Sequence, residues 1–198
     1  MEIESFVLVF LGTIPFYYVY DTFFLQWNER RADKVQLSDA ILAVLPRVNT
    51  SLWISMLSVG EVFVFGYTVL SVDESPWTTL TLFWVSFTYM HMLRMLCIWL
   101  CPLHAPVDGL VLRDTLVELV LPHSTPLRHD MFFSGHVALN VLFEVYSPVE
   151  VQWVFRVGTV VMTVCLLLGA YHYTIDILIG GVMAVYSVHT IEYVFNQM

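Results

Sequence analysis

Two short stretches of this sequence place ionisable groups within otherwise apolar surroundings. The first covers residues 129–136, which read HDMFFSGH, and the second covers residues 171–176, which read YHYTID. His172 and Asp176 are four residues apart, so on a helix they would share a face and touch. A carboxylate that holds the proton on one imidazole nitrogen leaves the other nitrogen available as a base or nucleophile.

A second imidazole, His136, follows two small residues, Ser134 and Gly135, that leave the backbone accessible. Two histidines and one aspartate suit an attack on phosphorus followed by release of the product, because one imidazole can transfer the protons that both steps require. The pattern therefore predicts an enzyme that acts on a phosphate ester. For His172 and Asp176 the alternative is a hydrogen bond that only packs helices, although carboxylates inside membranes are usually functional.

The composition indicates a membrane protein. Of the 198 residues, 58% are hydrophobic and only 13% are charged, whereas soluble domains usually carry about 25% charged residues. The formal net charge of −9 and the lack of a basic stripe exclude nucleic-acid binding. The three cysteines lie in apolar stretches and form no zinc-type CxxC pair. A metal site built from His129, His136 and His172 is the less favoured alternative, and we expect no metal and no other cofactor.

Apolar runs near the 20 residues that a bilayer requires predict an all-α integral membrane protein, with six spans in one domain covering residues 1–198. The expected spans are 6–27, 51–70, 77–100, 131–146, 151–170 and 172–195. Asp130 is expected to cap the fourth span, and Gly180 with Gly181 to let the sixth approach a neighbour closely. Residues 37–46 predict a short interfacial helix capped by Ser38 or Asp39, or a plain connector.

Counting the crossings places the two histidines on the same membrane face. His136 begins the fourth span and His172 begins the sixth, so two crossings separate them. All Lys and Arg residues except Arg156 lie on or near that face. The positive-inside tendency would make this face cytoplasmic.

The two histidine stretches resemble the signature motifs of sphingomyelin synthases and their relatives, within the superfamily of type-2 phosphatidate phosphatases. The resemblance extends weakly to residues 94–102 and 37–46. It implies six spanning helices and a catalytic triad of His136, His172 and Asp176. Cys165 and Leu166 stand where the phosphatase branch usually has a Ser-Arg pair, which favours the synthase branch, and Val137 stands where the synthases commonly have threonine.

The resemblance implies transfer of a phospho-headgroup from a phospholipid donor to a lipid alcohol, ceramide or diacylglycerol, through a phosphoryl-histidine. The alternatives are a phosphatase or phospholipase C-type hydrolase that uses water, and a non-catalytic lipid-binding protein. The family places the active site on the lumenal or exoplasmic side of the ER, Golgi or plasma membrane, and we favour this over the positive-inside tendency. The residues expected to bind substrate are Arg94, Arg113, Arg128, Ser134, Gly135, Asp130 and Tyr173.

Overall fold

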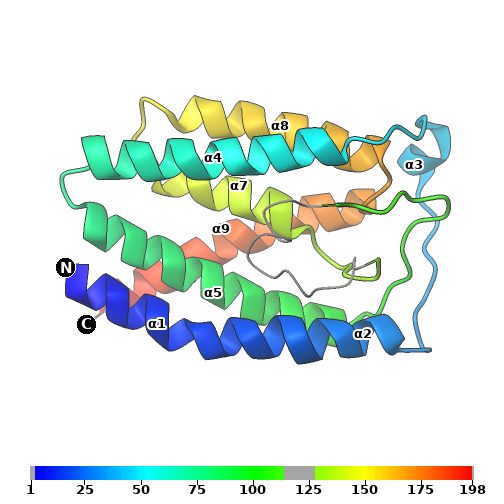
Figure 1. The fold of residues 1–198 in the computed structure, drawn as a ribbon, viewed down its shortest axis with the longest axis horizontal. Helices are drawn as coiled ribbons and strands as arrows, with labels where there is room; N and C mark the ends of the chain where they lie inside the picture. The colour runs from blue at the N-terminus through cyan, green and yellow to red at the C-terminus, as the bar shows by residue number, and fades with distance from the viewer. Residues whose placement is uncertain (1–2, 114–127, 198) are drawn as a thin grey trace.

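Residues 3–113 and 128–197 are described by a computed structural model, and within these ranges the regular structure is helical apart from one isolated bridge. Six lengthwise segments alternate in direction (Figure 1). They are α1 (Ile3–Val19), continued by a π-helical turn η1 (Tyr20–Leu25) and α2 (Gln26–Arg30), then α4 (Ser51–Val72), α5 (Pro76–Leu100), α7 (Gly135–Tyr146), α8 (Gln152–Leu168) and α9 (Thr174–Asn196). The short α3 (Ala40–Val44) lies at the end where the long loops gather.

Four of these segments are long and apolar enough to cross a membrane: Ile3–Arg30, Ser51–Val72, Pro76–Leu100 and Thr174–Asn196. The predicted all-helical fold is therefore confirmed for the described residues, and four segments could cross a membrane, but six crossings are not shown. With 12 and 17 residues, α7 and α8 extend about 18 and 26 Å at 1.5 Å per residue, less than a hydrocarbon core of about 30 Å.

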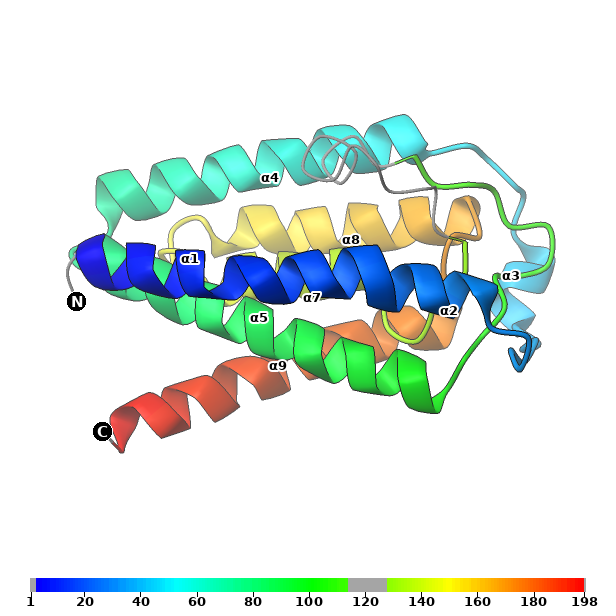
Figure 2. The same ribbon diagram turned by 60° about the horizontal axis from the view of Figure 1, so that its bottom comes forward.

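The shortest lengthwise helix, α7, packs against α4, α5, α8 and α9. In Figure 2 it lies largely hidden behind α1. Aromatic rings fill the space around it. Phe83 of α5 stacks on Phe143 of α7 with ring centroids 5.4 Å apart, and Phe65 of α4 contacts both rings. This central packing fixes the helix that carries His136.

The outward faces of the long helices are apolar, as expected of surfaces that contact lipid. Leu8 on α1, Phe63 on α4 and Leu178 on α9 are 72%, 73% and 62% exposed. A water-soluble monomer rarely exposes contiguous apolar surface on this scale. The inward faces hold the polar side chains, which is the arrangement that a bilayer enforces.

One carboxyl group is buried halfway along α4. Glu61 is 4% exposed, and its Oε1 accepts a hydrogen bond of 3.1 Å from Asn140 of α7. Gly158 of α8 lies opposite, and a Cβ built there would clash with the same oxygen, so a larger residue would displace the Glu61 carboxyl group. The polar pair and the glycine thus join three helices at one level of the bundle.

The start of α7 differs from the prediction. The helix begins at Gly135 rather than near Met131, and its cap is Ser134, whose Oγ accepts from the backbone N of Val137. Asp130 was wrongly predicted to be the cap. Phe132 and Phe133 take left-handed φ angles of 73° and 78°, which interrupt a helix. This turn places Ser134, four residues after Asp130, at the N-terminal end of α7.

The first turns of α9 lie directly on this capping residue. A Cβ built on Gly180 would sit 2.7 Å from the backbone O of Ser134, whereas nothing lies within 4 Å of the same position on Gly181. Of the two glycines expected to allow close packing, Gly180 therefore does so. The absent side chain lets α9 contact the beginning of α7, and with it the two histidine stretches.

We expect Gly180→Ala to destabilise the fold by roughly 1–3 kcal/mol, the usual cost of forcing a methyl group into a packed contact. The added methyl would push α9 away from Ser134. Thermal unfolding in a mild detergent measures the change. Gly181→Ala is the matched control and should unfold like the wild type; equal loss in both variants would contradict the close contact.

Candidate active site

His172 and Asp176 contact each other, as their spacing predicts, but not along a helix. The helix begins at Thr174, so His172 precedes it and turns back over the first residues of α9. His172 Nδ1 lies 3.3 Å from Asp176 Oδ2, with 5% of His172 and 1% of Asp176 exposed. When Nδ1 carries the proton of this contact, Nε2 keeps its lone pair for chemistry.

The carboxylate of Asp176 is held by its own helix start. Its Oδ2 also accepts from the backbone N of Tyr173 at 3.1 Å, so one oxygen serves the imidazole and the first turn together. Its Oδ1 is buried without a hydrogen-bond partner among the described residues. A buried carboxylate with spare acceptor capacity strongly favours a positive partner, which an imidazolium ion would provide.

A backbone hydrogen bond brings the two predicted motifs together. The N–H of Ser134 donates to the backbone O of Asp176 at 2.9 Å. His136 lies two residues further on, half-buried in the first turn of α7. Both histidines therefore lie at the same end of the bundle, as the crossing count predicts, with the amides of the α7 start beside them.

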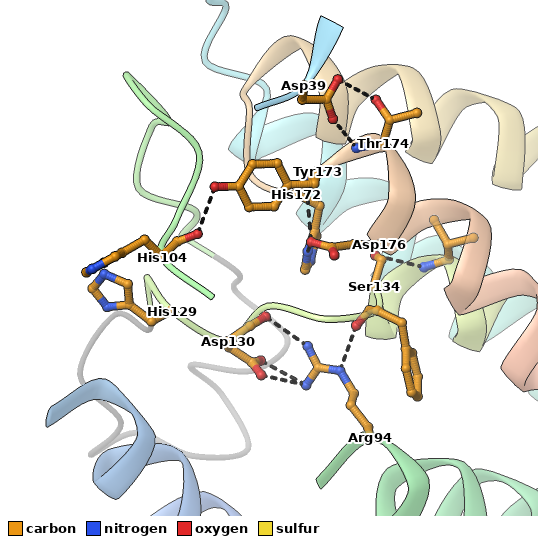
Figure 3. A network of polar contacts seen from close by, with 12 residues as sticks. Asp39, Arg94, His104, His129, Asp130, Ser134, His172, Tyr173, Thr174 and Asp176 are labelled. Carbon is orange, nitrogen blue, oxygen red and sulfur yellow. Dashed lines mark hydrogen bonds and ion pairs between the residues drawn. The ribbon is translucent and has the colours of Figure 1, made fainter. Parts of the chain in front are cut away.

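Arg94 sits beneath this turn and holds it (Figure 3). Its guanidinium donates to the backbone O of Phe133 at 3.0 Å, to the backbone O of Asp130 at 3.1 Å, and to a carboxylate oxygen of Asp130 at 2.9 Å. A fourth bond, of 2.8 Å, reaches the hydroxyl of Tyr20. These contacts use four of the five N–H groups of arginine. Arg94 and Asp130 thus form a clamp on the turn, and their contact with substrate stays a prediction.

Tyr173 joins the start of α9 to the loop before α3 and to the loop after α5. Its ring is 1% exposed, and its hydroxyl donates to the backbone O of His104 at 3.0 Å and accepts from Gln36 Nε2 at 2.6 Å. The two loops also pair with each other in the isolated bridge between Val35 and Leu103. Burial raises the pKa of the Tyr173 phenol. The residue predicted to contact substrate is therefore placed as a neutral anchor beside His172.

Asp39 caps two helices at once, which sequence reasoning anticipated only for α3. Its Oδ1 accepts from the backbone N of Ile41 and Leu42 in α3. Its Oδ2 accepts from the backbone N of Thr174 at 2.7 Å, at the first residue of α9. Burial opposes ionisation of Asp39, but the hydrogen bonds from Thr174 and the α3 amides outweigh it and lower the pKa of the carboxyl group.

A tether from α2 to the active-site turn was not foreseen. Glu29 Oε1 accepts from the backbone N of Arg128 and His129, and Oε2 lies 2.8 Å from His129 Nδ1. The neighbouring Asn28 donates to the backbone O of His129 at 2.7 Å. The two segments lie about one hundred positions apart, so no local pattern links them. The only signal in the sequence is Glu29 itself, a carboxylate within the charged residues 28–34 that follow the first apolar run.

The remaining predicted residues, Arg113 and Arg128, contact other parts of the loops and the start of α4. Arg128 is exposed and donates to the backbone O of Gly109, while Arg113 is exposed and its backbone meets Ser51 and Ser55 at the start of α4. Residues 114–127, the part of the predicted long loop between these two arginines, are outside the described residues. In the described ranges no group of three or more His, Cys, Asp or Glu residues is arranged to hold a metal ion.

We expect the double cap to give Asp39 a pH-dependent share of stability. Because its folded pKa is lowered, the contribution is full above the unfolded pKa and is lost as the pH falls through the folded pKa. Asp39→Ala should cost about 1–2 kcal/mol at pH 7, as for lost helix caps. Asp39→Asn, which can still accept hydrogen bonds, should cost less. Unfolding measured between pH 7 and 3 would contradict this if the gap between wild type and Asp39→Ala stayed constant.

A scan against models of protein families finds none that matches this chain, and a search of curated proteins finds no significant match. The resemblance to sphingomyelin synthases therefore stays a prediction that rests on the two histidine motifs.

Proposed function

We propose that this protein is a membrane lipid phosphotransferase, which moves a phospho-headgroup from a phospholipid donor to a lipid alcohol such as ceramide or diacylglycerol. The observation that carries the proposal is the His172–Asp176 pair, joined through Ser134 to the stretch that holds His136. The donor and acceptor are both membrane lipids, which suits a site at one end of a bundle with lipid-facing helices.

In the proposed reaction His172 Nε2 attacks the phosphorus of the donor headgroup, forming an N–P bond while the P–O bond to the glyceride breaks. His136 protonates the departing glyceride oxygen. It then takes the proton from the incoming hydroxyl, whose oxygen displaces His172 from phosphorus. Asp176 stabilises the imidazolium form of His172 in both steps.

The negative charge on the phosphoryl oxygens requires fixed donors. Four N–H groups of Arg94 already bind the protein, and the N–H of Ser134 binds Asp176. The backbone amide of Gly135, in the first turn of α7, is therefore the best-placed donor. Arg113 and Arg128 belong to loops at the same end and complete the proposed cationic surroundings. Water as the acceptor would turn the same chemistry into hydrolysis.

The proposal includes two features of membrane topology. The short helices α7 and α8 complete six crossings, with α7 entering the membrane only part of the way from the site end. The site opens to the lumenal or exoplasmic side of an endomembrane or the plasma membrane, as in the family that the motifs resemble. The Lys and Arg residues at the site end of the bundle would then bind phosphate and would not indicate the cytoplasmic side.

We expect Asp176→Asn to keep the size and most hydrogen bonds of the side chain but to lose the charge that stabilises the imidazolium. Turnover should fall by roughly 10²–10⁴-fold while thermal unfolding changes little. Glu192→Gln, near the other end of α9, makes the same chemical change and should leave turnover unaltered. Normal turnover in Asp176→Asn would show that the pair only packs.

A trapping experiment tests the covalent step. With a headgroup-labelled phospholipid and no acceptor, the wild type should collect acid-labile label on protein, because a phosphoramidate bond hydrolyses in acid. His172→Ala should collect none. His136→Ala should label slowly and then retain its label, because no base remains to activate the acceptor hydroxyl. Lipid mass spectrometry with ceramide, diacylglycerol or no added alcohol then identifies the acceptor.

Two outcomes would change the proposal. If product forms under rapid quench while no label ever appears on His172, the hydroxyl attacks phosphorus directly and His172 acts as a general base. If labelled headgroup is released at the same rate with and without a lipid alcohol, water is the acceptor and the protein is a hydrolase.

A further inference from the structure

A groove of about 380 Å³ lies between α3 and the loop that follows α5, on the outside of the site end. This volume falls in the range of small-molecule sites, roughly 300–1,000 Å³. Apolar side chains form most of its walls: Leu37, Leu42, Ala43, Pro106 and Val107. The ring of Tyr173 forms part of the wall, and neither His136 nor His172 lines the groove.

One cation in the groove lacks a carboxylate partner among the described residues. Arg47 donates through Nη1 to the backbone O of Leu45 at 3.0 Å, and its Nε is buried without a hydrogen-bond acceptor. The guanidinium groups of Arg31, Arg94 and Arg156, in contrast, each form an ion pair with a carboxylate. A buried, charged donor left without an acceptor is unfavourable, so an oxygen anion placed there would be bound.

The other charged group that lines the groove is already compensated. Asp39 accepts hydrogen bonds from Ile41, Leu42 and Thr174, at the N-terminal ends of two helices. Helix N-termini carry partial positive charge, which offsets the carboxylate. Arg47 therefore supplies the uncompensated charge of the groove, and the complementary ligand is an anion.

The surface around the groove indicates that this anion belongs to a lipid. Val44 is 81% exposed, Val107 62% and Val48 44%, so large apolar side chains are exposed beside the groove. It lies at the end of a bundle whose helices are long enough to span a membrane, where headgroups and acyl chains meet. A free phosphate ion would gain nothing from these apolar walls.

We propose that this groove binds one anionic phospholipid, with the phosphate at Arg47 and the beginning of an acyl chain along Ala43 and Val107. The site lies apart from the two histidines, and its occupancy requires no turnover. It is therefore independent of the phosphotransferase proposal, and an inactive protein would retain it.

Lipid retention by the full chain tests the proposal. Protein purified in a neutral detergent is titrated with dioleoyl-phosphatidylglycerol, and bound lipid is measured by native mass spectrometry alongside the midpoint of thermal unfolding. We expect saturable binding of one molecule and a rise in the midpoint. Arg47→Gln should weaken the binding by about tenfold or more, as for a lost charge-assisted hydrogen bond.

Two further variants separate charge from apolar contact. Ala43→Trp should fill the groove and weaken lipid binding while the guanidinium remains. Arg156→Gln removes an arginine at the opposite end of the bundle and should bind like the wild type. Measuring all variants without lipid first shows whether each is folded, and a misfolded Arg47→Gln would be replaced by Arg47→Lys, which should weaken binding less.

The proposal is overturned if Arg47→Gln binds phosphatidylglycerol as the wild type does, or if Arg156→Gln loses as much. Equal binding of dioleoyl-phosphatidylcholine would show that the net charge of the lipid is not recognised. A stabilisation by inorganic phosphate alone, equal to that by phosphatidylglycerol, would show a phosphate-ion site and not a lipid site.

Discussion

The guanidinium of Arg94 is the interaction on which the geometry of the candidate site depends. A cation buried at 5% exposure is stable only when its donors are matched, and here the acceptors come from η1 and from the turn before α7. Arg94 binds the backbone O of Asp130 and of Phe133, on either side of the turn. These bonds hold Phe132 and Phe133 in their left-handed conformations. That turn delivers Ser134 to the start of α7, where its N–H reaches Asp176.

The loops around the site are held by the same kind of interaction, polar side chains with several hydrogen-bond partners. Three polar side chains with several partners fix the connections near the histidines: Asp39 on two helix starts, Glu29 on the turn, and the Tyr173 hydroxyl between two loops. In a low-dielectric environment such fully bonded groups are costly to separate. The opposite end of the bundle, where helices are joined by short turns, relies mainly on aromatic packing.

Sequence alone predicted the helical membrane class, the limits of α4, α5 and α9 within a few residues, and the contact of His172 with Asp176. These follow from local patterns of hydropathy and spacing. It misplaced the cap of α7, because Asp130 is as good a capping residue as Ser134 until the φ angles of Phe132 and Phe133 are known. The Glu29–His129 tether and the second role of Asp39 depend on contacts across 100 and 135 positions, which no periodicity encodes.

The alternating direction of the lengthwise segments also decides where attached groups would lie. Ile3 and Gln197, the first and last described residues, both lie at the end of the bundle away from the histidines (Figure 1). A reporter domain fused at either position would be held at the opposite end of the bundle from His136 and His172. Such a fusion would leave the loops around His136 and His172 uncovered.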